Sequence, residues 1–378
     1  MPTATEVRRR RAAVLAAAAA SFILGLSLGA GHENAARQVD PAPTTTREDQ
    51  PQAPTQRPKP NSVEHLTLKE QVGKLVVLRF NGPTAPAYVK DLLRRGWAAG
   101  AILFKDNITD PRQLKRLTNE LRRAAKVTPI ICTDQEGGAV RNVAWSPPGP
   151  AQAGQTPQRD AKAAAQSLKS QGINVSLAPV ADVPSVAGSA LAPRAFTRDP
   201  NAAARAVRAA VEGWRAGGVA ATAKHFPGLG GTTVNTDHGS TSIPKAPTSG
   251  DLAPFKAAIE ARVPLIMSSH ARYPALDPER IASQSPKVLT TLLRHRLHYE
   301  GVVITDSIEA AAARATGSTE QIAVRSIAAG NDIVLTTGRG SWIRAYRALV
   351  AQARASLAFR ARVQESAARV AALQRTLS

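Results

Sequence analysis

The sequence predicts an α/β protein built as a single (β/α)8 TIM barrel, and three observations support this fold. The chain has 378 residues, of which 43% are hydrophobic and 20% charged, as in soluble globular proteins, and one barrel needs about 250. From residue 62 onward, short β-branched runs alternate with helical segments, a pattern typical of parallel strands joined by helical crossovers. No Gly-x-Gly-x-x-Gly motif follows the first strand, which disfavours an open doubly wound sheet.

Eight strands and seven intervening helices are expected from this alternation. The strands are expected at residues 75–80, 101–104, 130–134, 174–178, 219–223, 265–268, 302–305 and 332–336. The helices are expected at residues 85–95, 111–125, 159–170, 201–217, 251–262, 285–298 and 318–329. Asp110, Asp199 and Ser285 each precede a proline, so a capping side chain stands before a first-turn proline. Residues 344–377 are expected to form an amphipathic helix that closes the barrel.

The N-terminal region has the pattern of an export signal. Four arginines at residues 8–11 precede an uncharged run at residues 12–30, which is nearly long enough to span a bilayer. Residues 1–31 are therefore expected to be a signal peptide or an N-terminal anchor, and the sequence allows both. Either way the arginines stay inside, so the protein is expected to be extracytoplasmic, either secreted or tethered to the membrane through residues 12–30. Residues 32–61, rich in proline and threonine, are expected to form a disordered linker before a domain at residues 62–378.

The overall charge and the cysteine content restrict the partners. The chain has 49 Lys+Arg against 28 Asp+Glu, a formal net charge of +21, which suits an anionic polymer of the cell envelope. Aromatic residues make up only 4%, so the stacking platform of a nucleic-acid binder is missing and no nucleic-acid partner is expected. Cys132 is the one cysteine, which excludes an intrachain disulfide and a multi-thiolate zinc site; no metal or organic cofactor is expected.

Polar residues follow five of the expected strands. They are Asp134 after the third strand, Asp182 after the fourth, Lys224 and His225 after the fifth, His270 after the sixth and Asp306 after the seventh. Any one of these could be a structural polar group. Because the carboxyl ends of the strands meet at one mouth of a barrel, the set together predicts an active site there.

Four ordered motifs within residues 66–338 resemble family 3 glycoside hydrolases, and in particular their single-domain β-N-acetylhexosaminidase branch of bacterial peptidoglycan turnover. The motifs are DQEGG at 134–138, LAPVADV at 177–183, KHFPG at 224–228 followed by Gly230, and VITD at 303–306. The resemblance implies a retaining double displacement with Asp306 as nucleophile, and sugar contacts from Asp134, Arg194, Lys224 and His225, with a less defined substrate-binding role for His270. A retaining glycosidase needs such an ionised carboxylate and a proton donor at the leaving oxygen.

The proton donor is where the sequence departs from this branch, which carries an Asp-Ser-His segment whose Asp and His form the acid/base dyad. Here Asn235 occupies the dyad Asp position and Asp237 the dyad His position, with His238 one residue later. Three interpretations stay open: His238 as donor after a loop shift, Asp237 as donor with a raised pKa, or a lost donor.

The function expected from the sequence is an exported β-N-acetylhexosaminidase that acts on N-acetylglucosamine-containing glycans such as peptidoglycan fragments. The alternatives are a catalytically impaired barrel that binds cell-wall glycan and a family 3 hydrolase of another β-glycoside specificity. The second alternative is disfavoured because its two-domain members need more chain than the sequence has after the last strand.

Overall fold

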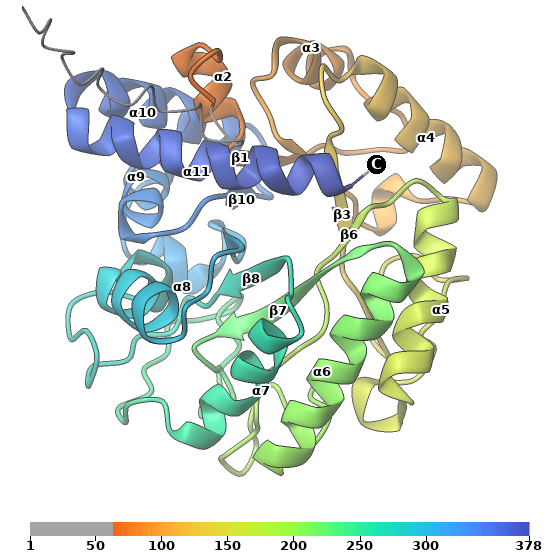
Figure 1. Ribbon diagram of the computed structural model, residues 1–378, viewed down its shortest axis with the longest axis vertical. Coiled ribbons are helices and arrows are strands. Elements are labelled where there is room, and N and C mark those ends of the chain that lie inside the picture. Colours follow the sequence, from red (N-terminus) through yellow and green to blue (C-terminus); the bar gives the residue numbers. More distant parts are fainter. Residues whose placement is uncertain (1–62, 378) are drawn as a thin grey trace, which may run out of the picture. The chain divides into compact units, whose positions relative to one another are not determined.

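Eight parallel strands form the barrel in the computed structural model, which describes residues 63–377 (Figure 1). The strands lie in the order β10-β1-β2-β3-β6-β7-β8-β9. They are β1 (Val76–Arg79), β2 (Gly100–Ile102), β3 (Ile130–Thr133), β6 (Val175–Ser176), β7 (Ala220–Phe226), β8 (Leu265–Ser268), β9 (Val302–Thr305) and β10 (Val334–Thr336). A parallel bridge between Ile304 and Ile333 joins the two end strands, and the Thr305 N–H donates to the Ile333 carbonyl at 3.0 Å. The predicted (β/α)8 barrel is therefore confirmed.

The signal or anchor expected at residues 1–31 and the linker expected at 32–61 lie outside the described residues. Within residues 63–377, no helix has both the length and the apolar character needed to cross a bilayer.

Strand β7 is longer than expected, and the difference matters for function. The sequence predicts its end at residue 223, but β7 continues to Phe226 and so includes Lys224 and His225. The extension is held because Lys224 pairs with Met267 of β8 on one side and forms a bridge with Val180 on the other. Lys224 is thereby fixed by backbone pairing rather than carried on a loop.

The helices surround the barrel, and most begin within two residues of the predicted position. They are α2 (Leu68–Gly73), α3 (Ala87–Arg95), α4 (Pro111–Ala124), α5 (Pro157–Ser170), α6 (Pro200–Gly217), α7 (Ser249–Glu260), η4 (Lys287–Arg296), α8 (Ala311–Arg314), α9 (Thr319–Ala329), α10 (Ser341–Ala355) and α11 (Leu357–Thr376). Short 3-10 turns lie at η1 (Lys105–Asn107), η2 (Gln152–Gly154) and η3 (Ala282–Gln284). Asp110 and Asp199 cap α4 and α6 as predicted, accepting from the N–H groups of Gln113 and Ala202 at 2.9 and 2.5 Å.

The helix expected at residues 285–298 is a π-helix over Lys287–Arg296 instead of an α-helix. Its wider turns end where Leu297 donates to the Leu292 carbonyl at 3.0 Å. Arg294 then donates to the carbonyl oxygens of Tyr299 and Gly301 at 2.9 and 2.6 Å, so a side chain satisfies acceptors beyond the helix end.

The expectation of one helix at residues 344–377 is wrong, because two helices occur there. Ser356 breaks the run with an extended backbone and caps α11 by accepting from the Phe359 N–H at 3.2 Å. Helix α10 follows β10 as the last barrel helix, while α11 passes across the barrel (Figure 1). Leu373 of α11 and Leu377, directly after the helix, join the apolar core inside the barrel. Gln374 donates to the Ala99 carbonyl before β2 at 3.1 Å. Helix α11 thus closes the N-terminal end of the barrel.

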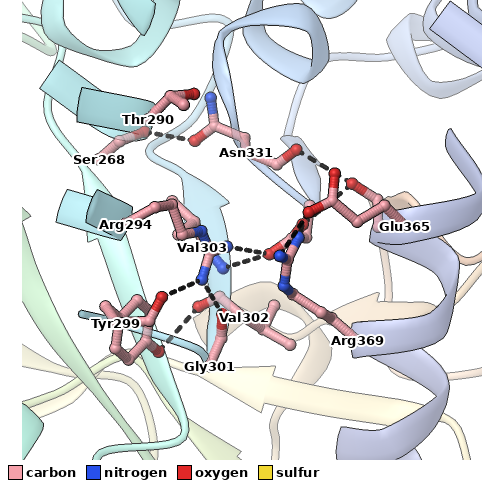
Figure 2. A network of polar contacts seen from close by, with 12 residues as sticks. Ser268, Thr290, Arg294, Tyr299, Gly301, Val302, Val303, Asn331, Glu365 and Arg369 are labelled. Atoms are coloured by element: carbon pink, nitrogen blue, oxygen red, sulfur yellow. Dashed lines mark hydrogen bonds and ion pairs between the residues drawn. The ribbon is translucent and has the colours of Figure 1, made fainter. Parts of the chain in front are cut away.

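A buried ionic cluster holds α11 in place. Asp332, two residues before β10, is fully buried. It lies 2.6 Å from Arg294 of η4, 2.9 Å from Arg362 and 3.4 Å from Arg369 of α11. Figure 2 shows Arg294 and Arg369 approaching from opposite sides, with Glu365 beside Arg369. Burial raises the pKa of Asp332, but the three guanidinium groups outweigh burial and lower it. The cluster therefore favours the ionised form of the carboxylate at its centre.

Candidate active site

Polar side chains from β3, β7 and β9 meet at the C-terminal end of the barrel, as the sequence predicts. The Lys224 Nζ lies 2.6 Å from Asp134 Oδ1 and 2.7 Å from Glu136 Oε1. Burial lowers the pKa of Lys224, but the charges of Asp134 and Glu136 outweigh burial and raise it. Lys224 is therefore a charged donor at the base of the mouth.

Glu136 is a site residue that the sequence reasoning did not select, although it lies in the DQEGG motif. Arg194 donates to it through two bonds, Nε to Oε2 at 2.9 Å and Nη2 to Oε1 at 2.7 Å. Burial raises the pKa of Glu136, but Lys224 and Arg194 outweigh burial and lower it to about 2. Glu136 thus stays ionised and orients both cations. The available signal was a second carboxylate two residues after the strand-end aspartate.

A short hairpin of β4 (Gln135–Gly137) and β5 (Val140–Arg141) presents Glu136, and the structure shows why this sequence folds so. The Gln135 amide donates to the carbonyl oxygens of Val143, Ser146 and Pro147 and accepts from the Val143 N–H, which satisfies a buried side chain completely. Gly137 has a φ of 99°, and a side chain there would meet the Pro150 carbonyl. The hairpin is therefore a rigid support.

Asp182 positions His225 beside Asp306. The Asp182 Oδ2 lies 2.8 Å from His225 Nδ1, and its Oδ1 accepts from the N–H groups of His225 at 3.2 Å and Leu229 at 2.6 Å. With Nδ1–H donating to the carboxylate, the other ring nitrogen faces Asp306, 3.9 Å from Oδ2. Asp182 therefore acts on the site through His225 rather than through the substrate.

Asp306 directly follows β9, and its Oδ1 accepts from the Ser307 N–H at 2.8 Å. Burial raises the pKa of Asp306, but His225, His270 and Lys224 outweigh burial and lower it. The lowered pKa favours the ionised carboxylate. Because the side chain is 18% exposed, a substrate can reach it from the mouth.

His270 is fully buried behind Asp306, with both ring nitrogens in use. Its Nδ1 lies 2.8 Å from Ser283 Oγ and its Nε2 lies 2.9 Å from the Ser307 carbonyl. A direct sugar contact from this ring would require one of these bonds to be exchanged. In this geometry, His270 holds the backbone that follows Asp306.

The segment around Asp237 is tied to the opening of α8. The carbonyl oxygens of Asp237 and Thr236 accept from the N–H groups of Ala311 and Ala312 at 3.2 and 3.1 Å. Asn235 Oδ1 accepts from the Asp237 N–H at 3.0 Å, so the amide at the dyad Asp position builds a turn. Desolvation, followed by the negative charge of Asp306, raises the pKa of Asp237. Two nearby carboxyl groups thus have opposite pKa shifts.

His238 lies on the same turn, and its side chain, like that of Asp237, is exposed. Its backbone N–H donates to the Asn235 carbonyl at 3.0 Å. Within residues 63–377 its imidazole has no hydrogen bond or ion pair. The negative charge of Asp306 acts on Asp237, and the assignment of the proton donor, to Asp237 or to His238, stays a prediction.

Comparison with known proteins identifies the family of this chain. Residues 67–373 match the family model described as the glycosyl hydrolase family 3 N terminal domain. A protein of Arthroderma benhamiae called an uncharacterized secreted glycosyl hydrolase is 34% identical over 339 residues, covering 83% of this chain and 95% of that one. A beta-hexosaminidase of Stenotrophomonas maltophilia is 34% identical over 279 residues, covering 69% of this chain and 82% of that one.

A solved structure of a family 3 enzyme is also similar to this chain. A family 3 beta-N-acetylglucosaminidase from Paenibacillus sp. superposes with a TM-score of 0.77 at 33% identity over 82% of this chain, which spans 62% of that protein. The barrel, the polar mouth and these relatives together show that the chain belongs to glycoside hydrolase family 3, in its β-N-acetylhexosaminidase-like branch.

Proposed function

We propose that this chain is an exported, retaining β-N-acetylhexosaminidase that acts on N-acetylglucosamine-containing glycans such as peptidoglycan fragments. The observation that carries the proposal is the pair of carboxyl groups with opposite pKa shifts, lowered at Asp306 and raised at Asp237. Two neighbouring carboxyl groups whose pKa values are shifted in opposite directions suit a general acid and a nucleophile.

In the first step, the Asp306 carboxylate attacks the anomeric carbon while Asp237 donates its proton to the glycosidic oxygen. The carbon–oxygen bond breaks and a glycosyl ester forms on Asp306. In the second step, Asp237, now a carboxylate, takes a proton from water as the water oxygen attacks the same carbon. The ester bond breaks, Asp306 recovers its charge, and the sugar leaves with its original configuration.

The four charged groups beside Asp306 suit recognition of the terminal sugar. Asp134 is 19% exposed and Arg194 21%, so both can exchange water for sugar hydroxyls, while Lys224 and Glu136 are almost fully buried and hold them in place. Charges fixed in this way lose little entropy on binding, which favours tight recognition of a polar ring.

The amino sugar and the location rest on the relatives and on the N-terminal sequence. Relatives named beta-hexosaminidase and beta-N-acetylglucosaminidase support the amino sugar, and one relative is described as secreted. The export-type pattern at residues 8–30 supports the same location for this chain. A membrane tether through residues 12–30 and contact with an anionic wall polymer belong to this proposal.

The test is to trap the intermediate. The full chain is incubated with a 5-fluoro N-acetylglucosaminyl fluoride and its intact mass is measured, followed by peptide mapping. We expect one added glycosyl group on the peptide that contains Asp306. Asp306→Asn is the matched control and should show no adduct.

Hydrolysis is measured in parallel with an aryl N-acetyl-β-glucosaminide. An adduct together with turnover supports the hydrolase. Binding of wall fragments without adduct or turnover would replace the proposal with a glycan-binding barrel, and an adduct on another residue would overturn the role of Asp306.

A further inference from the structure

A second concave site lies at the N-terminal end of the barrel, opposite Asp306. It has a volume of about 830 Å³ and lies between α6, α11 and the chain before and within β7, β8 and β9. Its floor includes the aliphatic side chains of Val211, Val219, Val302, Leu373 and Leu377. This volume is in the range of sites that enclose a small organic ligand, roughly 300–1,000 Å³. We call it the basal groove.

The rim of the basal groove is mainly cationic. Lys169, Arg215 and Arg262 come from the C-terminal ends of α5, α6 and α7, and none of them forms an ion pair within residues 63–377. Arg215 Nη1 donates to the carbonyl of Ala261 at 2.9 Å, so it is held next to the backbone of Arg262. Glu300 is the opposing acid at the rim.

The remaining two charges of the lining compensate each other. Arg369 is paired with Glu365 and with the buried Asp332 (Figure 2). The groove therefore keeps an excess of positive charge beside an apolar floor.

Basic residues near helix C-termini can simply complement the helix dipole, and this explains Lys169 and Arg215 without a ligand. Arg262 is different. It has a φ of 59°, and it ends α7 by donating to the Ile259 carbonyl at 2.8 Å, while the Val263 N–H donates to the Ala258 carbonyl at 2.9 Å. This left-handed position at a helix end favours glycine.

The same end of the barrel shows glycine at the equivalent positions of other helices. The left-handed or positive-φ residues after α3, α5, α6 and α9 are Gly96, Gly172, Gly218 and Gly330. Among described residues, Arg262 and His298, which follows η4, are the two non-glycine residues with positive φ, and only Arg262 lines the groove. Glycine would end α7 with less backbone strain. The arginine at this position therefore indicates that its side chain contributes to binding in the groove.

We propose that the basal groove binds an anionic membrane lipid, with an acyl chain on the aliphatic floor and the negative headgroup at Lys169, Arg215 and Arg262. Among the described residues that line the groove, none has an aromatic side chain on which a sugar ring could stack, which disfavours a second glycan site. The proposal goes beyond the glycosidase function and does not depend on it. Because the groove lies at the opposite end of the barrel from Asp306, a bound lipid leaves the active-site mouth open.

The test measures binding of hexadecanoate, below its critical micelle concentration, to the full chain by isothermal titration calorimetry. We expect saturable binding that Arg262→Gly weakens at least tenfold and that Ala372→Phe, which fills the groove from α11, also weakens. His298→Gly is the matched control, since it makes the same left-handed replacement outside the groove, and should bind as the wild type does. Hexadecyltrimethylammonium, with the same chain and the opposite charge, should bind at least tenfold more weakly than hexadecanoate.

Folding and activity are controlled in the same experiment. Arg262→Gly should raise the melting temperature, so a loss of binding in this variant would not result from unfolding. Its turnover of the aryl glycoside should equal that of the wild type. If the wild type does not bind hexadecanoate, the proposal is overturned, whether the groove binds nothing or is filled by another part of the chain. Equal binding by Arg262→Gly, or equal binding of the cationic analogue, would overturn it as well.

Discussion

Replacing Asp332 by asparagine tests whether one buried carboxylate holds α11 on the barrel. The Asp332 side chain is 0% exposed, and Arg294, Arg362 and Arg369 lie 2.6, 2.9 and 3.4 Å from it. Asparagine has almost the same size as aspartate. It can still accept from the Val303 N–H, which lies 3.0 Å from Asp332 Oδ2 in the structure. The perturbation is therefore the loss of the negative charge among three guanidinium groups.

The magnitude follows from burial. Removing one partner of a buried ion pair costs about 3–5 kcal/mol. The three ion pairs do not each contribute this cost, because Arg362 and Arg369 also contact Glu365. These two arginines keep 16% and 25% of their side-chain surface exposed. For a domain of this size, a loss of about 3–5 kcal/mol lowers the melting temperature by roughly 5–8 °C.

Thermal unfolding at pH 7, followed by circular dichroism, measures the difference. Glu365→Gln is the matched control, since this residue of the same cluster is 52% exposed and should cost less than about 1 kcal/mol. Because the folded-state pKa of Asp332 is lowered, its contribution is present above the unfolded pKa and is lost as pH falls through the folded value. The difference in melting temperature between the wild type and Asp332→Asn should therefore become smaller as the pH is lowered. Equal melting of Asp332→Asn and Glu365→Gln at pH 7 would refute the reasoning.

The active site and the N-terminal region give four more predictions. Asp306→Asn should keep the melting temperature and lower kcat by several powers of ten, and activity within about tenfold of wild type would remove Asp306 as nucleophile. The pH profile of kcat/KM should fall in acid as Asp306, with its lowered pKa, gains a proton, and fall toward higher pH as Asp237, with its raised pKa, loses one. Asp237→Asn should abolish the second fall and slow natural disaccharides by about 10²–10⁴ but aryl glycosides far less, whereas the same pattern in His238→Ala alone would move the acid/base to His238. Deletion of residues 1–61 should leave the melting temperature unchanged, because the sequence predicts a signal or anchor and a linker there. Aggregation of the shortened protein would argue against the predicted boundary.

The fold was predictable because each barrel element has a local sequence signal. Apolar β-branched runs mark strands, and Asp110 and Asp199 before proline mark helix starts, so the eight strands and most helix positions follow from residues close in the chain. The gathering of Asp134, Lys224 and Asp306 at one mouth also follows, since strand ends converge in this fold. The exact ends of β7 and the break at Ser356 did not follow, because pairing with neighbouring strands and packing of α11 decide them.

The amino-acid sequence by itself determined the barrel, its family and the residue types at the mouth. Only the tertiary structure decided that Glu136 binds Arg194, 58 residues away, that the charge of Asp306 raises the pKa of Asp237, and that Arg262 lines a groove at the far end of the barrel. The physical reason is that a pKa or an ion pair depends on distances of a few ångströms between side chains from different elements, whereas local sequence patterns record burial and backbone geometry along one element at a time.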